Sequence, residues 1–315
     1  MKQENRDVLL TLIRQHQELG IAEQIDFEKF YLYSIITHST AIEGSTVTEV
    51  EAQLLFDEGI TSGKRTMIEQ QMNLDLKSAY DYGRKWIMAH PPITTEWLIT
   101  LAAKVMAQTG SQKVPSRLEA FCKQLNERRK AIDSNDIPAI YDLSFWAHFE
   151  LVTIHPWADG NGRTCRLLMN LLQWEFGVLP TKVLKEDKTE YIQALIDARE
   201  KEDINVFLDC MARLHIQHLK NDIDQYMNSC EEKMVDKQDL KQEMVGKWSI
   251  KPSLADKLAD ILAFLADKET TTTDDIVRHF GFTATTAKRY LRQLAEYGYL
   301  ESHGGNRNRY YSKRK

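Results

Sequence analysis

The sequence predicts a mainly α-helical protein with a distinct C-terminal module. Only 14 glycines and 7 prolines occur in 315 residues, and apolar side chains recur at helical spacing over long stretches. Residues 247–315 hold 13 basic and 8 acidic residues, a net charge of +5, whereas the whole chain carries −5. This difference in charge indicates two modules that bind different partners.

Helices are expected in order along the first module. Residues 28–44 form a helix that ends at Gly44, and residues 46–59 form the next, with Thr46 or Thr48 as N-cap and Glu49 or Glu51 as its capping-box partner. The same spacing of apolar residues predicts further helices at 69–88, 95–107, 115–131, 140–154, 163–176, 188–199 and 204–227. The highly charged run 230–247 is typical of an exposed connecting helix.

The C-terminal residues have the pattern of a helix-turn-helix unit. Helices are expected at 253–268, 272–281 and 283–298, followed by two short strands around Gly304 and Gly305. This order resembles a winged helix. The third helix would bury Ala287, Tyr290, Leu291 and Leu294. Candidate nucleic-acid contacts on its outer face and in the wing are Thr285, Lys288, Arg289, Arg292, Arg307 and Arg309. Such a basic surface could bind DNA or dock a protein, and both readings stay open.

Composition also excludes several classes of protein. The N-terminus has no apolar segment behind a basic region, and no window approaches ~18 uninterrupted apolar residues. We therefore expect neither a secretory signal nor a membrane span, and we expect the protein in the cytoplasm. The four cysteines are scattered without CxxC spacing, which argues against a zinc cluster and a disulfide framework.

The stretch HPWADGNGRTCR, residues 155–166, concentrates the polar chemistry. Gly160, Asn161 and Gly162 precede an apolar helix, where unpaired N–H groups and the helix dipole favour an anion, with phosphate as the expected ligand. Arg163 and Arg166, three positions apart, could bind further phosphate oxygens. A nucleoside triphosphate fits this set better than a monophosphate, although the chain has no GxxxxGK[ST] P-loop.

Two residues ahead of the glycines could carry out a reaction. Asp159 would repel phosphate unless a divalent cation lay between them, so Mg²⁺ is the expected bridge. His155, at the end of an apolar helix, is a candidate general base for an incoming hydroxyl. Each residue also has a structural alternative, as loop glycine, N-cap or hydrogen-bonded histidine. A zinc site at His148, His155 and Asp159 would lack a third strong ligand.

This stretch resembles the signature of the Fic-domain family, HxFx(D/E)(A/G)N(G/K)RxxR, with Trp157 in place of the usual phenylalanine. The helical surroundings from about residue 30 to 215 resemble the same domain. The resemblance implies transfer of AMP from Mg·ATP to a hydroxyl side chain of a target protein, with release of pyrophosphate. Gly162 favours adenylylation, because the kinase-like branch of the family usually has lysine there.

The resemblance also implies a role for each residue of the motif. His155 would deprotonate the target hydroxyl, and Asp159 would hold Mg²⁺. The anion hole and the binding of the phosphate chain would fall to Gly160, Asn161, Gly162, Arg163 and Arg166.

A second stretch, STAIEG, resembles the inhibitory motif (S/T)xxxE(G/N) of Fic proteins that carry an inhibitory helix ahead of the core. It contributes Ser39, Glu43 and Gly44. Glu43 would end a helix, where the macrodipole disfavours an anion, so a nearby cation is expected. The family implies that this cation is Arg166, the arginine that the γ-phosphate needs. The enzyme would then restrain itself, with Ser39 helping to fix the glutamate.

Two further features concern the nucleotide and the target. Tyr191 resembles a tyrosine that follows the motif and lies near the nucleotide, although its helical spacing suits a packing residue equally. The interval 107–117 is too short for the β-hairpin flap that usually presents the target. Either the flap is reduced or residues are missing there.

The resulting prediction is a mainly α protein with a Fic-type helical domain followed by a small winged helix-turn-helix domain. Its parts are N-terminal helices with the inhibitory motif (1–92), the Fic catalytic core (93–228), a charged helical linker (229–252) and the winged helix (253–315). The predicted function is a self-inhibited protein adenylyltransferase that uses ATP and Mg²⁺. Its target protein would bear a Ser, Thr or Tyr hydroxyl and could be the chain itself.

Other functions remain open at this point. The same residues could remove AMP from a modified protein, or transfer another nucleotidyl or phosphoryl group. In a different class, the chain could be a nucleic-acid-binding regulator whose Fic-like part is a non-catalytic ligand sensor. DNA is a candidate partner of the winged helix, a homo-oligomer is conceivable, and no membrane partner is expected.

Overall fold

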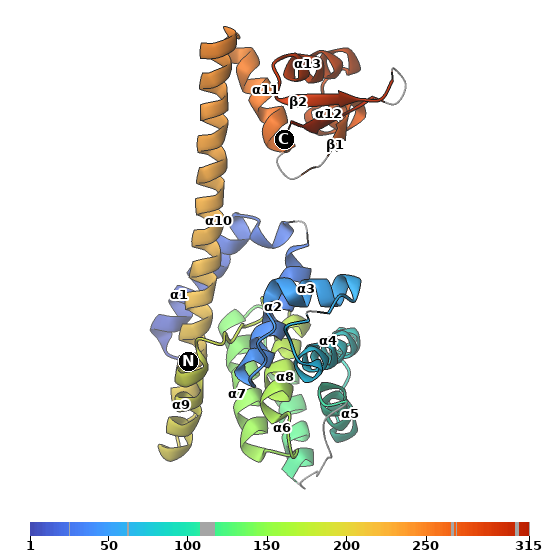
Figure 1. Ribbon diagram of the computed structural model, residues 1–315. Helices are drawn as coiled ribbons and strands as arrows, with labels where there is room; N and C mark the ends of the chain where they lie inside the picture. The colour runs from blue at the N-terminus through green and yellow to red at the C-terminus, as the bar shows by residue number, and fades with distance from the viewer. Residues whose placement is uncertain are drawn as a thin grey trace. The chain divides into compact units, whose positions relative to one another are not determined.

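The computed structural model describes residues 1–24, 26–61, 63–107, 117–265, 268, 270–305 and 309–314, with only the helical backbone at 231–236. The chain divides into two compact units, Met1–Ile223 and Asp224–Lys315. The predicted mainly α fold is confirmed (Figure 1). Within the described part of the chain, no helix is long and apolar enough to cross a bilayer.

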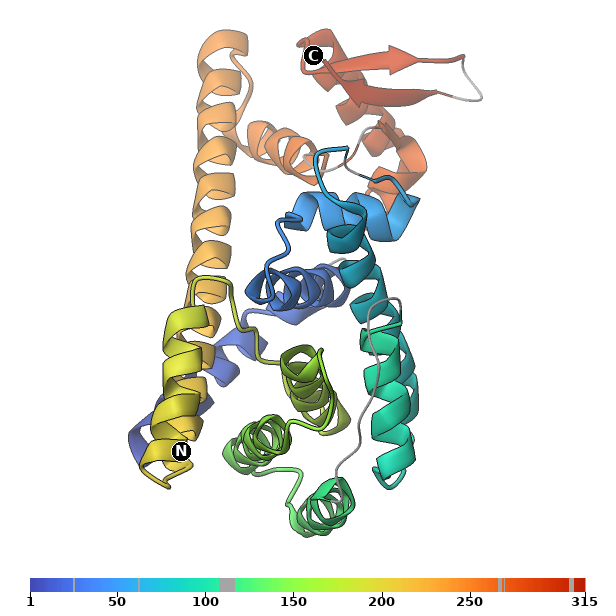
Figure 2. The same ribbon diagram turned by 60° about the horizontal axis from the view of Figure 1, so that its bottom comes forward.

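The first unit is built from helices around a buried pair. These helices are α1 (Gln3–Glu18), η1 (Ile21–Glu23), α2 (Phe27–Ile42), α3 (Glu49–Glu58), α4 (Met67–Ile87), α5 (Thr95–Val105), α6 (Arg117–Ala131), α7 (Ile137–Ile154), α8 (Asn161–Glu175), α9 (Lys188–Glu200) and the first part of α10 (Asn205–Trp248). Helices α7 and α8 pack along each other, and α8 is also covered by α4, α5 and α2 (Figures 1 and 2). Nearly every side chain of α8 is therefore buried, polar ones included.

A missing side chain lets α4 lie close to α8. A Cβ on Gly83 of α4 would lie only 2.5 Å from Cδ1 of Leu171, which is fully buried. A glycine inside a helix costs about 0.5–1 kcal/mol relative to alanine, and the close packing against Leu171 offsets this cost. The packing places the N-terminus of α8 beside α2 and α5.

Several local predictions are confirmed and two are wrong. Thr48 caps α3 and forms a capping box with Glu51. Helix α8 begins at Asn161 and not at residue 163, because Gly160 takes the left-handed N-cap position and Asn161 starts the first turn. The helices expected at 204–227 and 230–247 are one helix, α10, since the two residues between them, Asn228 and Ser229, include no glycine or proline.

In the described residues of the second unit, the end of α10 is followed by three helices and a three-stranded sheet. Its elements after α10 are α11 (Pro252–Phe264), β1 (Thr270–Thr272), α12 (Thr273–Phe280), α13 (Ala284–Glu296), β2 (Leu300–His303) and β3 (Tyr310–Lys313). The sheet has the order β1-β3-β2 and is antiparallel, with Tyr311 of β3 opposite Thr271 and Ser302. Strand β1 was not predicted. The buried face of α13 consists of the four residues predicted above.

Candidate active site

His155 stands at the end of α7 in a conformation that few residues adopt. It is the C-cap of α7, with φ 51°, and its N–H donates to the Leu151 carbonyl at 3.2 Å. A left-handed conformation at a residue other than glycine persists only where neighbours hold it. The exposed imidazole is held by Asn161, whose Nδ2 lies 3.1 Å from His155 Nε2.

Asn161 also closes the turn between α7 and α8. Its Oδ1 accepts from the Trp157 N–H at 3.0 Å, and its Nδ2 donates to the Trp157 carbonyl at 2.7 Å. These two bonds fix the orientation of the amide, so Nδ2 is the donor towards His155 and Nε2 is the acceptor. The Trp157 ring packs in the core and is 3% exposed. Asn161 therefore holds, through Nε2, the ring of the histidine proposed from the sequence as the base.

The first turn of α8 has no capping side chain, an arrangement that favours an anion at its N–H groups. Gly160, the N-cap, has φ 77° and offers no side chain to the first-turn N–H groups. A Cβ there would lie 2.6 Å from Met106 Cγ. A Cβ on Gly162 would lie 2.8 Å from Glu43 Oε1 and 3.0 Å from Arg166 Nη1. The backbone of this turn thus meets a carboxylate, the kind of group that a helix N-terminus attracts.

Arg166 is buried and tied to the end of α2. Its Nη2 donates to Glu43 Oε1 at 2.7 Å and to the Ser39 carbonyl at 3.0 Å, and its Nε donates to Ser39 Oγ at 2.9 Å. The Arg166 side chain is 3% exposed and that of Glu43 34%. Burial lowers the pKa of Arg166, but Tyr191 and Glu43 outweigh this effect and leave the pKa raised. Glu43 precedes Gly44, whose φ of 104° lets the chain turn away.

Arg163 has poorer partners than Arg166. Its side chain is 4% exposed, its Nη2 lies 2.8 Å from the Met106 thioether sulfur, and its Nε has no hydrogen-bond partner among the described residues. Burial lowers its pKa. A buried donor without an acceptor costs free energy, so this guanidinium gains from an incoming anion.

Asp159 is the exposed carboxylate of the site. Its Oδ1 accepts from the Gly160 N–H at 2.6 Å, and its Oδ2 lies 3.7 Å from Arg163 Nη2. No cluster of three or more His, Cys, Asp or Glu side chains that could hold a metal occurs among the described residues. His148, considered above for zinc, is fully buried and faces Tyr191. The donor set suits a cation that takes most of its ligands from phosphate, as Mg²⁺ does.

Tyr191 lies in the interior, with Arg166 Cζ 6.0 Å from the centre of its ring. It is 1% exposed, and its hydroxyl oxygen lies 2.9 Å from His148 Nε2. This contact, like that of Met106 with Gly160, was missed by the sequence analysis, because helical periodicity marks such residues only as core. In the flap interval, residues 108–116 lie outside the described residues.

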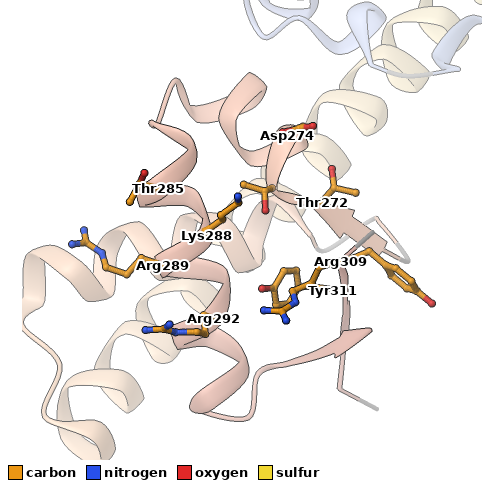
Figure 3. Close-up of a pocket in the computed structure, with 10 residues that line it drawn as sticks. Thr272, Asp274, Thr285, Lys288, Arg289, Arg292, Arg309 and Tyr311 are labelled. Atoms are coloured by element: carbon orange, nitrogen blue, oxygen red, sulfur yellow. The ribbon is translucent and has the colours of Figure 1, made fainter. Parts of the chain in front are cut away.

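The winged-helix residues gather around a hollow of about 1020 Å³ (Figure 3). Thr285, Lys288, Arg289 and Arg292 line it from α13, and Arg309 lines it from the start of β3. The opposite wall includes Thr272, Thr273 and Asp274 at the start of α12. Arg307 lies outside the described residues.

Family models match both the region around residues 155–166 and the winged helix. The Fic/DOC family model matches residues 87–173, and the IclR helix-turn-helix domain model matches residues 254–304. A protein adenylyltransferase Fic from Nematostella vectensis is 29% identical over 211 residues, which cover 62% of this chain and 48% of that protein. The chain spans about half the length of the curated relatives it matches.

Solved structures show the same fold. Fic-1 from C. elegans (residues 134–508) superposes with a TM-score of 0.58 at 22% identity, covering 70% of this chain and 71% of that one. A Fic family protein from Desulfovibrio desulfuricans G20 has a TM-score of 0.58 at 16% identity, covering 98% and 96%. The chain thus contains a Fic domain, which the family model matches at residues 87–173, and it is similar to adenylyltransferase Fic proteins over a longer stretch.

Proposed function

We propose that this protein is a protein adenylyltransferase that transfers AMP from Mg·ATP to a hydroxyl of a target protein and restrains itself through Glu43. The observation that carries the proposal is the Glu43–Arg166 ion pair, 2.7 Å long, at the first turn of α8, where the Fic motif converges. The name protein adenylyltransferase Fic, carried by the curated relatives, supports the reaction type.

In the proposed reaction, His155 Nε2 accepts the proton of the target hydroxyl while the oxygen attacks the α-phosphorus of ATP. The bond from the α-phosphorus to the bridging oxygen breaks, and pyrophosphate leaves with that electron pair. The first-turn N–H groups of α8 stabilise the charge on the phosphate oxygens. Asp159 would hold the Mg²⁺ that accompanies ATP and neutralises its phosphates. Arg163 and Arg166 orient the phosphate chain.

Inhibition follows from competition for one guanidinium. The Glu43 carboxylate and the terminal phosphate of ATP are both anions that can bind Arg166. The contact is intramolecular, so Glu43 is present at high effective concentration and wins while α2 stays in place. Withdrawal of Glu43 would free Arg166 and the space over Gly162.

The test is transfer of label to protein from ATP labelled on the α- or the γ-phosphate. Wild type is compared with Glu43→Gly, with Glu43→Gln, which keeps the shape without the charge, and with Glu43→Gly combined with His155→Ala. We expect α-label transfer to rise roughly tenfold or more in both single variants. Removing His155 should lower it by about 10²–10⁴-fold. His279→Ala, a histidine of the second unit, is the control.

Other results would indicate other functions. Transfer of the γ-label alone would mean a kinase-like reaction. Release of AMP from a pre-modified target, without forward transfer, would mean that Glu43 orients water. If adding His155→Ala reduced transfer of neither label, the histidine would have no role in the reaction.

We also propose that the winged helix binds duplex DNA. The supporting observation is the basic lining of the hollow beside α13, since Lys288, Arg289, Arg292 and Arg309 are all exposed on one face (Figure 3). Phosphate neutralisation by such residues supplies much of protein–DNA affinity. The match to the IclR helix-turn-helix model supports α13 as the helix that enters the major groove.

This second proposal is tested by fluorescence anisotropy with labelled duplex DNA. Arg292→Ala should weaken binding several-fold and lower the salt slope by about 1. Lys257→Ala, an exposed lysine on α11 outside the hollow, should leave both unchanged. Equal effects of the two variants would mean that the hollow is not the DNA surface.

A further inference from the structure

Arg166 contacts two different parts of the chain, the end of α2 and Tyr191 of α9. All three of its hydrogen bonds described above go to Ser39 and Glu43, at the C-terminal end of α2. Tyr191 of α9 also lies near, with Arg166 Cζ 6.0 Å from the centre of the ring. Withdrawal of Glu43 with the end of α2 would remove every one of those hydrogen bonds and leave the contact from α9.

Tyr191 is itself rigidly placed. It is 1% exposed, and its hydroxyl oxygen lies 2.9 Å from Nε2 of His148 on α7. The His148 ring is fully buried and stacks on Phe207, with centroids 5.2 Å apart and planes at 22°. The tyrosine is therefore held by His148 of α7, which in turn stacks on Phe207 of α10.

The protonation states of His148 and Tyr191 determine which of the two donates the hydrogen bond between them. Burial lowers the pKa of His148 to about 3, helped by the nearby Arg166, so the imidazole is neutral. Burial raises the pKa of Tyr191 to about 12, so the phenol keeps its proton. A neutral Nε2 can accept this proton in a hydrogen bond, which leaves the lone pairs of the Tyr191 oxygen for the guanidinium.

We infer that Tyr191, backed by His148, is a positioning residue that keeps Arg166 directed at the first turn of α8 after Glu43 has been withdrawn. A buried guanidinium that lost Ser39 and Glu43 together would otherwise rotate towards solvent or another anion. The inference rests on the proposed function, because Arg166 is held ready for the terminal phosphate of ATP.

The chain contains a matched control for this pair. Tyr141, also fully buried, lies 2.9 Å through its hydroxyl from Nε2 of the buried His215, in the same hydrophobic cluster as Tyr191. The Tyr141 hydroxyl donates to the Leu179 carbonyl at 2.7 Å. Tyr141→Phe and Tyr191→Phe therefore both remove a buried hydroxyl from a buried histidine, but only Tyr191 adjoins Arg166.

The experiment measures ligand binding by calorimetry with Mg²⁺ present, in a background that combines Ser39→Ala with Glu43→Gly and so removes both α2 side chains that bind Arg166. We expect Tyr191→Phe to weaken ATP binding about tenfold, since hydrogen bonds to charged groups are worth more than neutral ones. AMP, which lacks the terminal phosphates, should bind with less than a twofold change. Tyr141→Phe should change neither affinity, although it should lower Tm about as much as Tyr191→Phe does.

A second variant keeps the test independent of the tyrosine substitution. His148→Phe retains a ring to stack on Phe207 but offers no acceptor to the Tyr191 hydroxyl, and it should cause a smaller loss with the same preference for ATP over AMP. Equal losses for ATP and AMP, or equal losses in Tyr141→Phe and Tyr191→Phe, would overturn the inference. If Glu43→Gly alone bound no ATP, the proposed function would fail first, and the inference with it.

Discussion

The two cationic regions of this protein, the start of α8 and the hollow beside α13, differ in solvent exposure. At the first turn of α8, Arg163 and Arg166 are 4% and 3% exposed, and each has its geometry set by neighbouring helices. In the hollow of the second unit, the Arg292 side chain is 68% exposed and pairs with Glu296 on the same helix. Burial makes each contact at α8 strong and selective for one geometry, whereas exposed charges act together over distance and are screened by salt.

The largest expected contrast is in the response to acid. His148 and His215 lie in the first unit, and burial lowers the pKa of each to about 3, whereas an unfolded histidine titrates near 6.5. Between these values the unfolded chain binds protons that the folded unit does not, so stability is lost as pH falls below about 6.5. The two histidines should together lower the free energy of unfolding by up to about 2–3 kcal/mol per pH unit.

Urea unfolding at pH 7 and pH 5 tests this expectation. Five of the six tryptophans lie in the first unit, so their fluorescence follows its unfolding. His215→Gln should flatten the pH dependence, since glutamine does not titrate. A free energy of unfolding that stays constant between pH 7 and pH 5 would contradict the burial of these side chains.

The second contrast is in the response to salt. If Lys288, Arg289, Arg292 and Arg309 each neutralise one phosphate, DNA affinity should fall roughly 100-fold between 50 and 200 mM salt. AMP transfer by the Glu43→Gly variant should change only a few-fold over the same range, because its guanidinium groups are buried. Anisotropy and label transfer measured in the same buffers compare the two regions directly. If AMP transfer were as sensitive to salt as DNA binding, the distinction between buried and exposed cationic regions would not hold.

The smallest expected effect concerns the glycine that begins α8. Gly160→Ala adds both a left-handed alanine and a Cβ 2.6 Å from Met106 Cγ, whereas Gly177→Ala adds only the left-handed alanine, with open space around it. Gly160→Ala should destabilise the first unit by about 1–3 kcal/mol, and Gly177→Ala by about 1 kcal/mol. Thermal melts of the two variants separate strain from close contact. Equal shifts in Tm would mean that Met106 moves aside freely.

Helices α3 and α8 show which structural features could be predicted from the sequence. The capping box of α3 and the turn from His155 to Gly162 could be read from a few consecutive residues, because capping, glycine conformation and the helix dipole act locally. The strand β1 could not, since three threonines become a strand only by pairing with β3, some forty residues later. The start of α8 was misplaced by two residues for a related reason, because an asparagine and a glycine are poor helix formers in isolation.

The sequence by itself determined the helical class of the chain, most of its helices from α2 onward, the buried face of α13 and the residues of the Fic motif. Only the tertiary structure decided what these residues touch. Glu43 and Arg166 are 123 positions apart, and Met106 and Arg163 are 57 apart. Helical periodicity identifies the face that will be buried, but many packings of the same helices satisfy it equally. Side-chain volumes and hydrogen bonds select one packing, and that selection brought Tyr191 and His148 behind Arg166.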